Sequence, residues 1–179
     1  MTGKDATDVV LAEARQALNE GRSIYEDELN WRLHALAEAH DEKAKAFFVE
    51  VIQSARDDIW RLETLCDIGF HYDLSSDAAI VDQIREMLND PDIDVRMAAA
   101  SVLGIRSSWP DHGLYRTMTM DPNEFVRRAA FRALVRLSGN DRKQYSHLAL
   151  QILDGKILAT PANLKALIGE KFIDLVPDE

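Results

Sequence analysis

The sequence has 179 residues, a length that suits one domain or one compact array of repeats. Hydrophobic residues make up 46% and charged residues 29%, which excludes a disordered or collagen-like chain. The formal net charge is −10, which disfavours binding to nucleic acid or to an anionic membrane surface, because both require clustered cations.

Cysteine content and the N-terminal segment predict the cellular compartment. The single cysteine, Cys66, excludes an internal disulfide framework and a thiolate metal cluster made by one chain. No apolar run reaches the length of a membrane span, and the first ten residues lack the basic and apolar regions of a signal peptide. We therefore expect a soluble protein of the cytoplasm.

Charge is distributed unevenly along the chain. Residues 1–90 hold 20 acidic and 9 basic side chains, whereas residues 91–179 hold 11 acidic and 12 basic ones. No linker rich in proline, glycine or serine separates the halves, so the sequence predicts a single domain over residues 1–179.

Apolar residues recur with helical spacing in successive segments of the chain, and no stretch alternates as a strand would. Helix starts are indicated by Asp90-Pro91, Asp121-Pro122 and Thr160-Pro161, each of which pairs a capping side chain with proline at the first helical position. The predicted fold class is all-α. The first helices of the predicted pairs lie near residues 5–20, 41–55, 77–89, 111–120 and 141–153.

An internal repeat is the strongest pattern in the sequence. The segment 90–99 (DPDIDVRMAA) aligns without gaps on 121–130 (DPNEFVRRAA), a shift of 31 residues. Trp60-Arg61 lies 35 residues before Val95-Arg96, and Trp31-Arg32 lies 29 residues before Trp60-Arg61. This register predicts that Trp31 and Trp60 are core residues, like Val95 and Val126.

The pattern D-P-x-x-x-V-R-x-A-A-x-x-x-L resembles a HEAT repeat, in the short form associated with phycobilisome-lyase HEAT-like proteins. The resemblance implies a right-handed α-solenoid of about five stacked helix pairs, in which stacking buries the apolar face that one pair alone leaves exposed. The expected pairs are residues 5–40, 41–69, 77–104, 111–137 and 141–175.

An arginine recurs once per repeat at the same position. The resemblance implies that these side chains form a structural hydrogen-bond ladder between successive repeats, a task that suits the forked donors of a guanidinium. The alternative is a row of arginines that binds a partner. The ladder residues are Arg32, Arg61, Arg96 and Arg127, with Asp90 and Asp121.

Outward positions on the second helix of each pair are the candidate partner-binding surface. At 100° per residue they lie one, four and five residues after the repeated arginine. The alternatives are that neighbouring helices cover the leucines, and that the arginines form a solvated face. The candidates are Leu33, Leu62, Met97, Arg128, Phe131, Arg132 and Arg136.

Catalytic and metal-binding motifs are not recognised in the sequence. The five histidines form no i, i+4 pair and no H-E-x-x-H motif, and no P-loop or G-x-S-x-G motif occurs. We therefore expect no enzyme activity, no metal and no cofactor.

The sequence thus favours a non-catalytic module that binds a protein partner. Its acidity suggests an inhibitor, an immunity protein or an adaptor that masks a basic surface of the partner. The alternative, taken from the lyase resemblance, is a subunit that resembles a bilin lyase or handles another small molecule. We expect neither nucleic acid nor a membrane as a partner.

Overall fold

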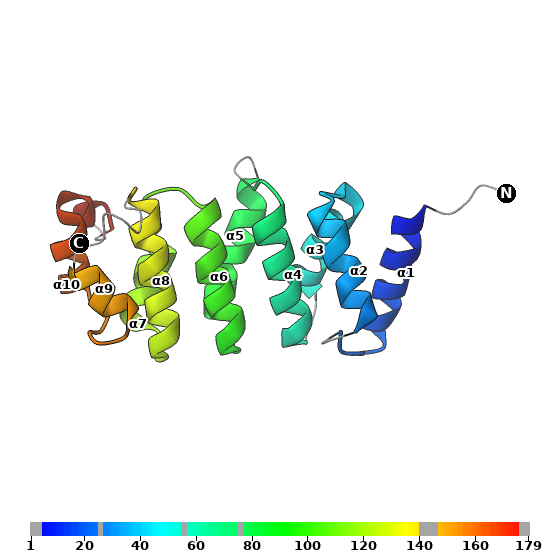
Figure 1. Cartoon of the computed structure of the whole chain (residues 1–179), viewed down its shortest axis with the longest axis horizontal. Helices are drawn as coiled ribbons and strands as arrows, with labels where there is room; N and C mark the ends of the chain where they lie inside the picture. Colours follow the sequence, from blue (N-terminus) through cyan, green and yellow to red (C-terminus); the bar gives the residue numbers. More distant parts are fainter. Residues whose placement is uncertain (1–4, 25–26, 55–56, 75–76, 140–146, 176–179) are drawn as a thin grey trace. The chain divides into compact units, whose positions relative to one another are not determined.

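The computed structural model describes residues 5–24, 27–54, 57–74, 77–139 and 147–175. Within these ranges the regular elements are all helical, so the predicted all-α fold class is confirmed there (Figure 1). They are α1 (Ala6–Asn19), α2 (Glu28–Glu38), α3 (Glu42–Ser54), α4 (Asp58–His71), α5 (Ala78–Glu86), the 3-10 helix η1 (Met87–Asn89), α6 (Ile93–Arg106), α7 (His112–Met120), α8 (Glu124–Leu137), α9 (His147–Leu153), α10 (Pro161–Ile168) and the 3-10 helix η2 (Gly169–Leu175).

Two compact units divide the chain, the first over residues 1–83 and the second over residues 84–179. In the first unit α1, α2, α3 and α4 pack against one another, and in the second unit α8 packs against α6, α7 and α9. The right-handed superhelix, the number of repeat pairs and the single domain stay predictions.

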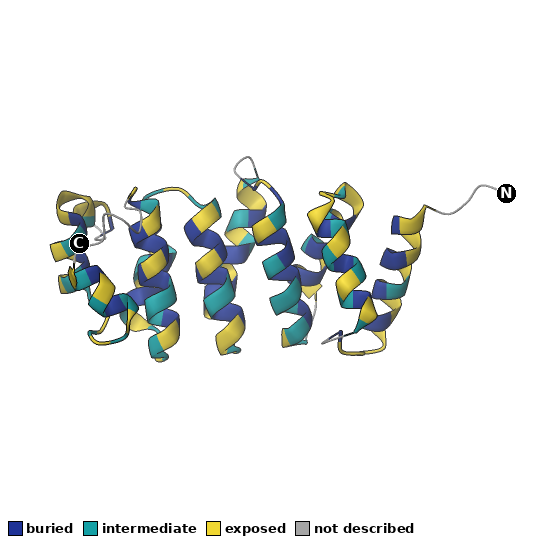
Figure 2. Ribbon diagram, in the orientation of Figure 1, coloured by how far each residue is buried: buried dark blue, intermediate teal, exposed yellow. Residues whose placement is uncertain are grey.

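The core of the first unit is built from aromatic and branched side chains. Phe47, Phe48 and Val51 of α3 are buried together with Trp60 and Ile68 of α4, and dark blue marks these faces in Figure 2. The Trp60 indole donates a hydrogen bond to the carbonyl oxygen of Arg22 at 2.9 Å, so this buried polar group is satisfied.

The core of the second unit includes a very close contact between two helices. A Cβ atom placed on Gly104 of α6 would lie 2.7 Å from Ala133 Cα of α8. The backbones of α6 and α8 therefore approach each other where only glycine fits. None of the helices in the described ranges has the length and apolar character needed to cross a membrane.

Candidate functional site

Helix caps set which residues of α4, α6 and α8 face the core. Asp57, Asp92 and Asn123 cap these helices by accepting hydrogen bonds from the first backbone N–H groups. Three residues after each cap comes a side chain that is at most 1% exposed: Trp60, Val95 and Val126. The buried positions Trp60, Val95 and Val126 are thus separated by 35 and 31 residues, the offsets that the sequence repeat predicts.

The register predicted for α2 is wrong. Its cap is Asp27, and Leu29 takes the buried position with 1% exposure, whereas Trp31 is 69% exposed. The buried Leu29 therefore corresponds to the buried Trp60, 31 residues later. The same offset separates the buried Val95 of α6 from Val126 of α8. The pair of identical Trp-Arg dipeptides produced the offset of 29, although the apolar stripe determines the rotation of the helix. In α2 the buried residue comes two residues after the cap, not three.

This correction changes the candidate surface. Leu33, predicted to face a partner, is 2% exposed and belongs to the core of the first unit, and Trp31 occupies the position equivalent to Leu62 and Met97. Leu62 and Met97 are half-buried. Phe131 is fully buried, because its position faces the core in α8. Leu33 and Phe131 are therefore removed from the candidate surface.

Exposed aromatic side chains lie on the outward positions of the first unit. Trp31 of α2 is 69% exposed, and Phe70, two turns after Leu62 on α4, is 53% exposed. The carboxylates of Glu28 and Glu38 on α2 and of Glu63 on α4 lie on the same helices. We call this set the α2–α4 face; it comprises Glu28, Trp31, Glu38, Leu62, Glu63 and Phe70.

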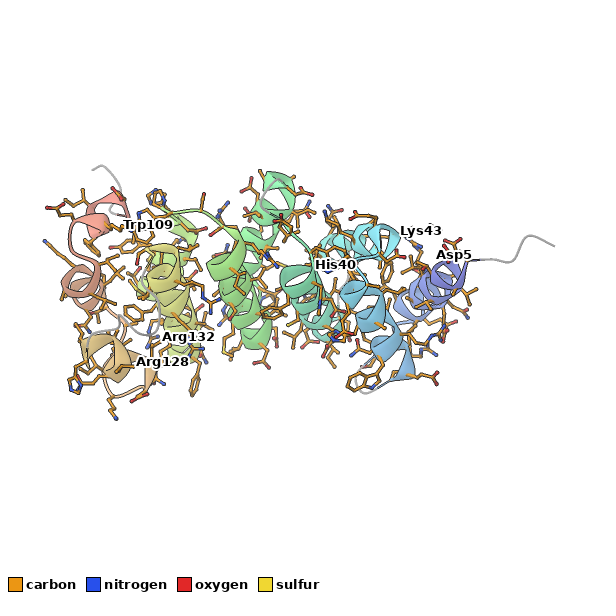
Figure 3. The ribbon with its side chains drawn as sticks, turned by 45° about the horizontal axis from the view of Figure 1, so that its top comes forward. Asp5, His40, Lys43, Trp109, Arg128 and Arg132 are labelled. Atoms are coloured by element: carbon orange, nitrogen blue, oxygen red, sulfur yellow. The ribbon has the colours of Figure 1, made fainter. Side chains whose placement is uncertain are left out.

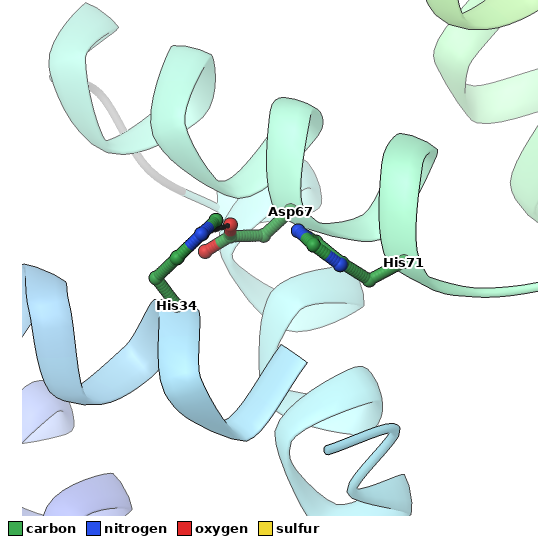
Figure 4. Close-up of side chains that lie close together, drawn as sticks. All are labelled: His34, Asp67 and His71. Atoms are coloured by element: carbon green, nitrogen blue, oxygen red, sulfur yellow. Dashed lines mark hydrogen bonds and ion pairs between the residues drawn. The ribbon is translucent and has the colours of Figure 1, made fainter. Parts of the chain in front are cut away.

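A cluster of polar side chains joins α2 to α4 within the same unit (Figure 4). His34 Nδ1 lies 2.7 Å from Asp67 Oδ1, and the rings of His34 and His71 meet edge to face with centroids 4.9 Å apart. His34 Nε2 lies 3.6 Å from Glu38 Oε1. Asp67 is 6% exposed, whereas both histidines are half-buried.

Burial and hydrogen bonding shift the pKa values of this cluster. Burial raises the pKa of Asp67 above its usual value, although the hydrogen bond from His34 acts in the opposite direction. That bond raises the pKa of His34. Burial also raises the pKa of the neighbouring Cys66 thiol to about 11, which leaves the thiol protonated at neutral pH.

Sequence reasoning missed this cluster. Asp67 and His71 are separated by four residues on one helix, a signal that a search restricted to histidine pairs overlooks. The contribution of His34 depends on the packing of α2 against α4, which the sequence does not display.

The three arginines predicted to form a binding stripe on α8 have different environments (Figure 3). Arg128 is held inside the second unit: its Nη2 donates to the carbonyl oxygen of Gly155 at 3.1 Å and also pairs with Glu124. Its guanidinium carbon lies 5.6 Å from the centre of the Phe125 ring. Arg132 and Arg136 are exposed. The prediction of one continuous binding stripe is therefore wrong at Arg128, because the side chain is already engaged.

The second unit contains the geometry of an inter-repeat ladder. Arg96 Nε and Nη2 donate to the carboxylate of Asp121 at 2.8 and 3.3 Å, and Arg96 Nη1 donates to the carbonyl oxygens of Asp90 and Pro91. Arg127 donates in the same way to the carbonyl oxygens of Asp121 and Pro122. Each arginine thus closes the turn before its own helix, and Arg96 also reaches the next repeat.

The first unit does not repeat this arrangement at Arg32. Its guanidinium pairs with Glu13 of α1 at 2.7 Å, as expected after the change of register. Arg61, at the position equivalent to Arg96, is half-buried, and alanine stands at position 55 where the later repeats have Asp90 and Asp121.

A cleft of about 500 Å³ in the second unit bears on the small-molecule alternative. Its lining includes Arg85, Arg96 and Arg116. Arg85 is paired with Asp111 at 3.0 Å and Arg96 with Asp121, so two of these cations are already neutralised within the fold. This pairing disfavours the cleft as a site for a ligand with several carboxylates.

Comparison with known proteins gives one match to a family model. The model described as HEAT repeat matches residues 80–105, which include most of α5, η1 and nearly all of α6. Neither the curated proteins nor the solved structures give a significant match.

Proposed function

We propose that the chain, whose residues 80–105 match the HEAT repeat model, is a non-catalytic module that binds a protein partner through the α2–α4 face. Helical repeats of this class commonly present surfaces to other proteins. The observation that carries the proposal is Trp31, a tryptophan 69% exposed at the outward position of its helix. Tryptophan is among the residues most enriched at the energetic centres of protein interfaces.

The charge around this tryptophan supports a partner with a basic contact surface. Glu28 and Glu38 lie on the same side of α2 as Trp31, three residues before it and seven after it, and both are exposed. Glu63 of α4 adds a third carboxylate to the α2–α4 face. Apolar side chains surrounded by carboxylates suit a partner segment whose lysine or arginine side chains flank apolar residues.

We infer that the module acts by covering that basic surface, as an inhibitor, an immunity protein or an adaptor does. Electrostatic complementarity accelerates encounter and selects the partner, and burial of Trp31 and Phe70 slows dissociation. The cytoplasm is the compartment that we propose for this interaction.

A comparative pull-down tests the proposal. Wild-type protein and two variants are used as baits in a native extract: Trp31→Ala with Phe70→Ala, and the control Met120→Ala. Met120 is 71% exposed but belongs to the second unit. The proposal requires a protein with a basic surface that the wild type and the control retain and the double variant loses. If every captured protein is retained equally by all three baits, the α2–α4 face is not the binding site.

A further inference from the structure

Two imidazoles and one buried carboxylate meet where α2 packs against α4 (Figure 4). Each of the three side chains can offer one ligand atom, and these atoms all lie within 4.8 Å of one another. We propose that His34, Asp67 and His71 form a binding site for a divalent transition-metal ion of the Zn²⁺ class. This site lies beside the α2–α4 face and is independent of the proposed function.

The spacing of the ligand atoms is close to that of a tetrahedral zinc site. Zinc bonds of about 2.0 Å to nitrogen and oxygen place neighbouring ligand atoms about 3.3 Å apart. His34 Nδ1 and Asp67 Oδ1 are 2.7 Å apart, close enough for a metal ion to replace the hydrogen between them. The third atom, from His71, lies within 4.8 Å of the other two, so a rotation of its half-buried imidazole has to bring it inward by at most about 1.5 Å.

The backbone fixes two of the three ligands in advance. Asp67 and His71 are four residues apart on α4, so both side chains project from the same side of one helix. His34 comes from α2, whose packing against α4 brings the third side chain to them. Only the α2–α4 contact has to be maintained for the ligand set to remain assembled.

The donor set selects the class of metal. Imidazole nitrogen suits zinc, copper and nickel, whereas calcium and magnesium prefer sets made entirely of oxygen. Two histidines with one carboxylate occur as the protein ligands of open zinc sites, in which water or a further ligand takes the fourth position. Among the residues that the structure describes, this group offers three ligand atoms, so one coordination position is left for water.

A carboxylate lies near the second ring nitrogen of the first ligand, just beyond hydrogen-bond distance. When Nδ1 of His34 binds the metal, Nε2 carries the hydrogen, and Glu38 Oε1 lies 3.6 Å from that atom. Carboxylates that hold the second nitrogen of a ligating histidine are common around zinc and strengthen its binding. Bound metal would connect α2 with α4 and stabilise the first unit.

Calorimetric titration of the metal-free protein with Zn²⁺ tests the site. The variants are His34→Gln and His71→Gln, and the matched control is His112→Gln, which removes an exposed histidine of α7. We expect one zinc ion per wild-type and control chain, and binding at least tenfold weaker in each of the two site variants. Equal affinity in all four proteins would overturn the proposal.

Histidine NMR of the wild-type protein provides a second test that does not depend on the folding of a variant. One equivalent of Zn²⁺ should shift the ring signals of His34 and His71 and leave those of His40, His112 and His147 in place. Uniform small shifts of all five histidines, or no shifts, would also overturn the proposal. The same titration with Mg²⁺ should leave every ring signal unchanged.

Discussion

The guanidinium of Arg96 holds the carboxylate of Asp121, 25 residues later in the chain, through two hydrogen bonds of 2.8 and 3.3 Å. The side chains of Arg96 and Asp121 are only 10% and 6% exposed. This pair connects the helix of one repeat to the turn that begins the next, while Nη1 of the same arginine closes its own turn.

Arg96→Ala should destabilise the second unit strongly. The substitution leaves the buried Asp121 carboxylate without its cation, and the loss of one partner of a buried ion pair costs about 3–5 kcal/mol. Arg127→Ala is the matched control, because Arg127 donates to two carbonyl oxygens at the equivalent turn, and its loss should cost about 1–2 kcal/mol. Urea unfolding followed by circular dichroism measures both, and equal losses would contradict the importance of the Asp121 contact.

Gly104→Ala should also destabilise the second unit. The added methyl group would lie 2.7 Å from Ala133, so α6 and α8 must separate, at a cost of about 1–3 kcal/mol. Gly113→Ala provides the comparison within a helix, because its methyl group would meet the side chains of Arg85 and Leu88 at 3.0–3.2 Å. Thermal melting should show a clear decrease for Gly104→Ala and little change for Gly113→Ala. A Gly104→Ala variant as stable as the wild type would show that the helices are not in close contact.

Two neighbouring arginines of α8 should respond differently to charge reversal. Arg128→Glu removes the donor to Gly155 and places a second carboxylate one turn after Glu124, which should lower stability by about 1–2 kcal/mol. Arg132→Glu alters an exposed side chain and should change stability by less than about 0.5 kcal/mol. Melting temperatures of the two variants decide the matter; indistinguishable melting temperatures would refute the internal role of Arg128.

Parts of this structure could be predicted from the sequence because they depend on local chemistry. Helical spacing predicts the helices, and the aligned segments 90–99 and 121–130 predict the matching registers of α6 and α8. The caps predicted at Asp90 and Asp121 are wrong, because Asp92 and Asn123 cap these helices, whereas the cap predicted at Thr160 is confirmed. The rotation of α2 could not be predicted from Trp31-Arg32, because the buried stripe of α2 is Leu29, Leu33 and Ala37 and is not in register with that dipeptide. Nor could the approach of His34 to Asp67, which depends on the packing of two helices.

Association with the proposed protein partner should depend on salt. The carboxylates of the α2–α4 face would attract a basic surface over several ångströms, and ions at physiological concentration screen charges beyond about 8–10 Å. The association rate constant, measured by surface plasmon resonance with the purified partner, should fall as salt is raised from low to physiological concentration.

Glu28→Gln with Glu38→Gln should reduce both the association rate and its salt dependence. Glu20→Gln with Glu170→Gln removes two exposed charges outside the α2–α4 face, one at the C-terminal cap of α1 and one in η2, and serves as the control. An association rate that salt does not change would exclude electrostatic attraction of this kind.

The environments of the three tryptophans make the chain its own optical reporter. Trp31 is largely exposed to solvent and should emit at long wavelength and be quenched by iodide, whereas Trp60 is shielded in the core of the first unit. Trp109 belongs to the second unit, where its indole donates to Asp174 at 2.9 Å. Three single-tryptophan variants would therefore follow the α2–α4 face, the core of the first unit and the C-terminal helices separately, without an added dye.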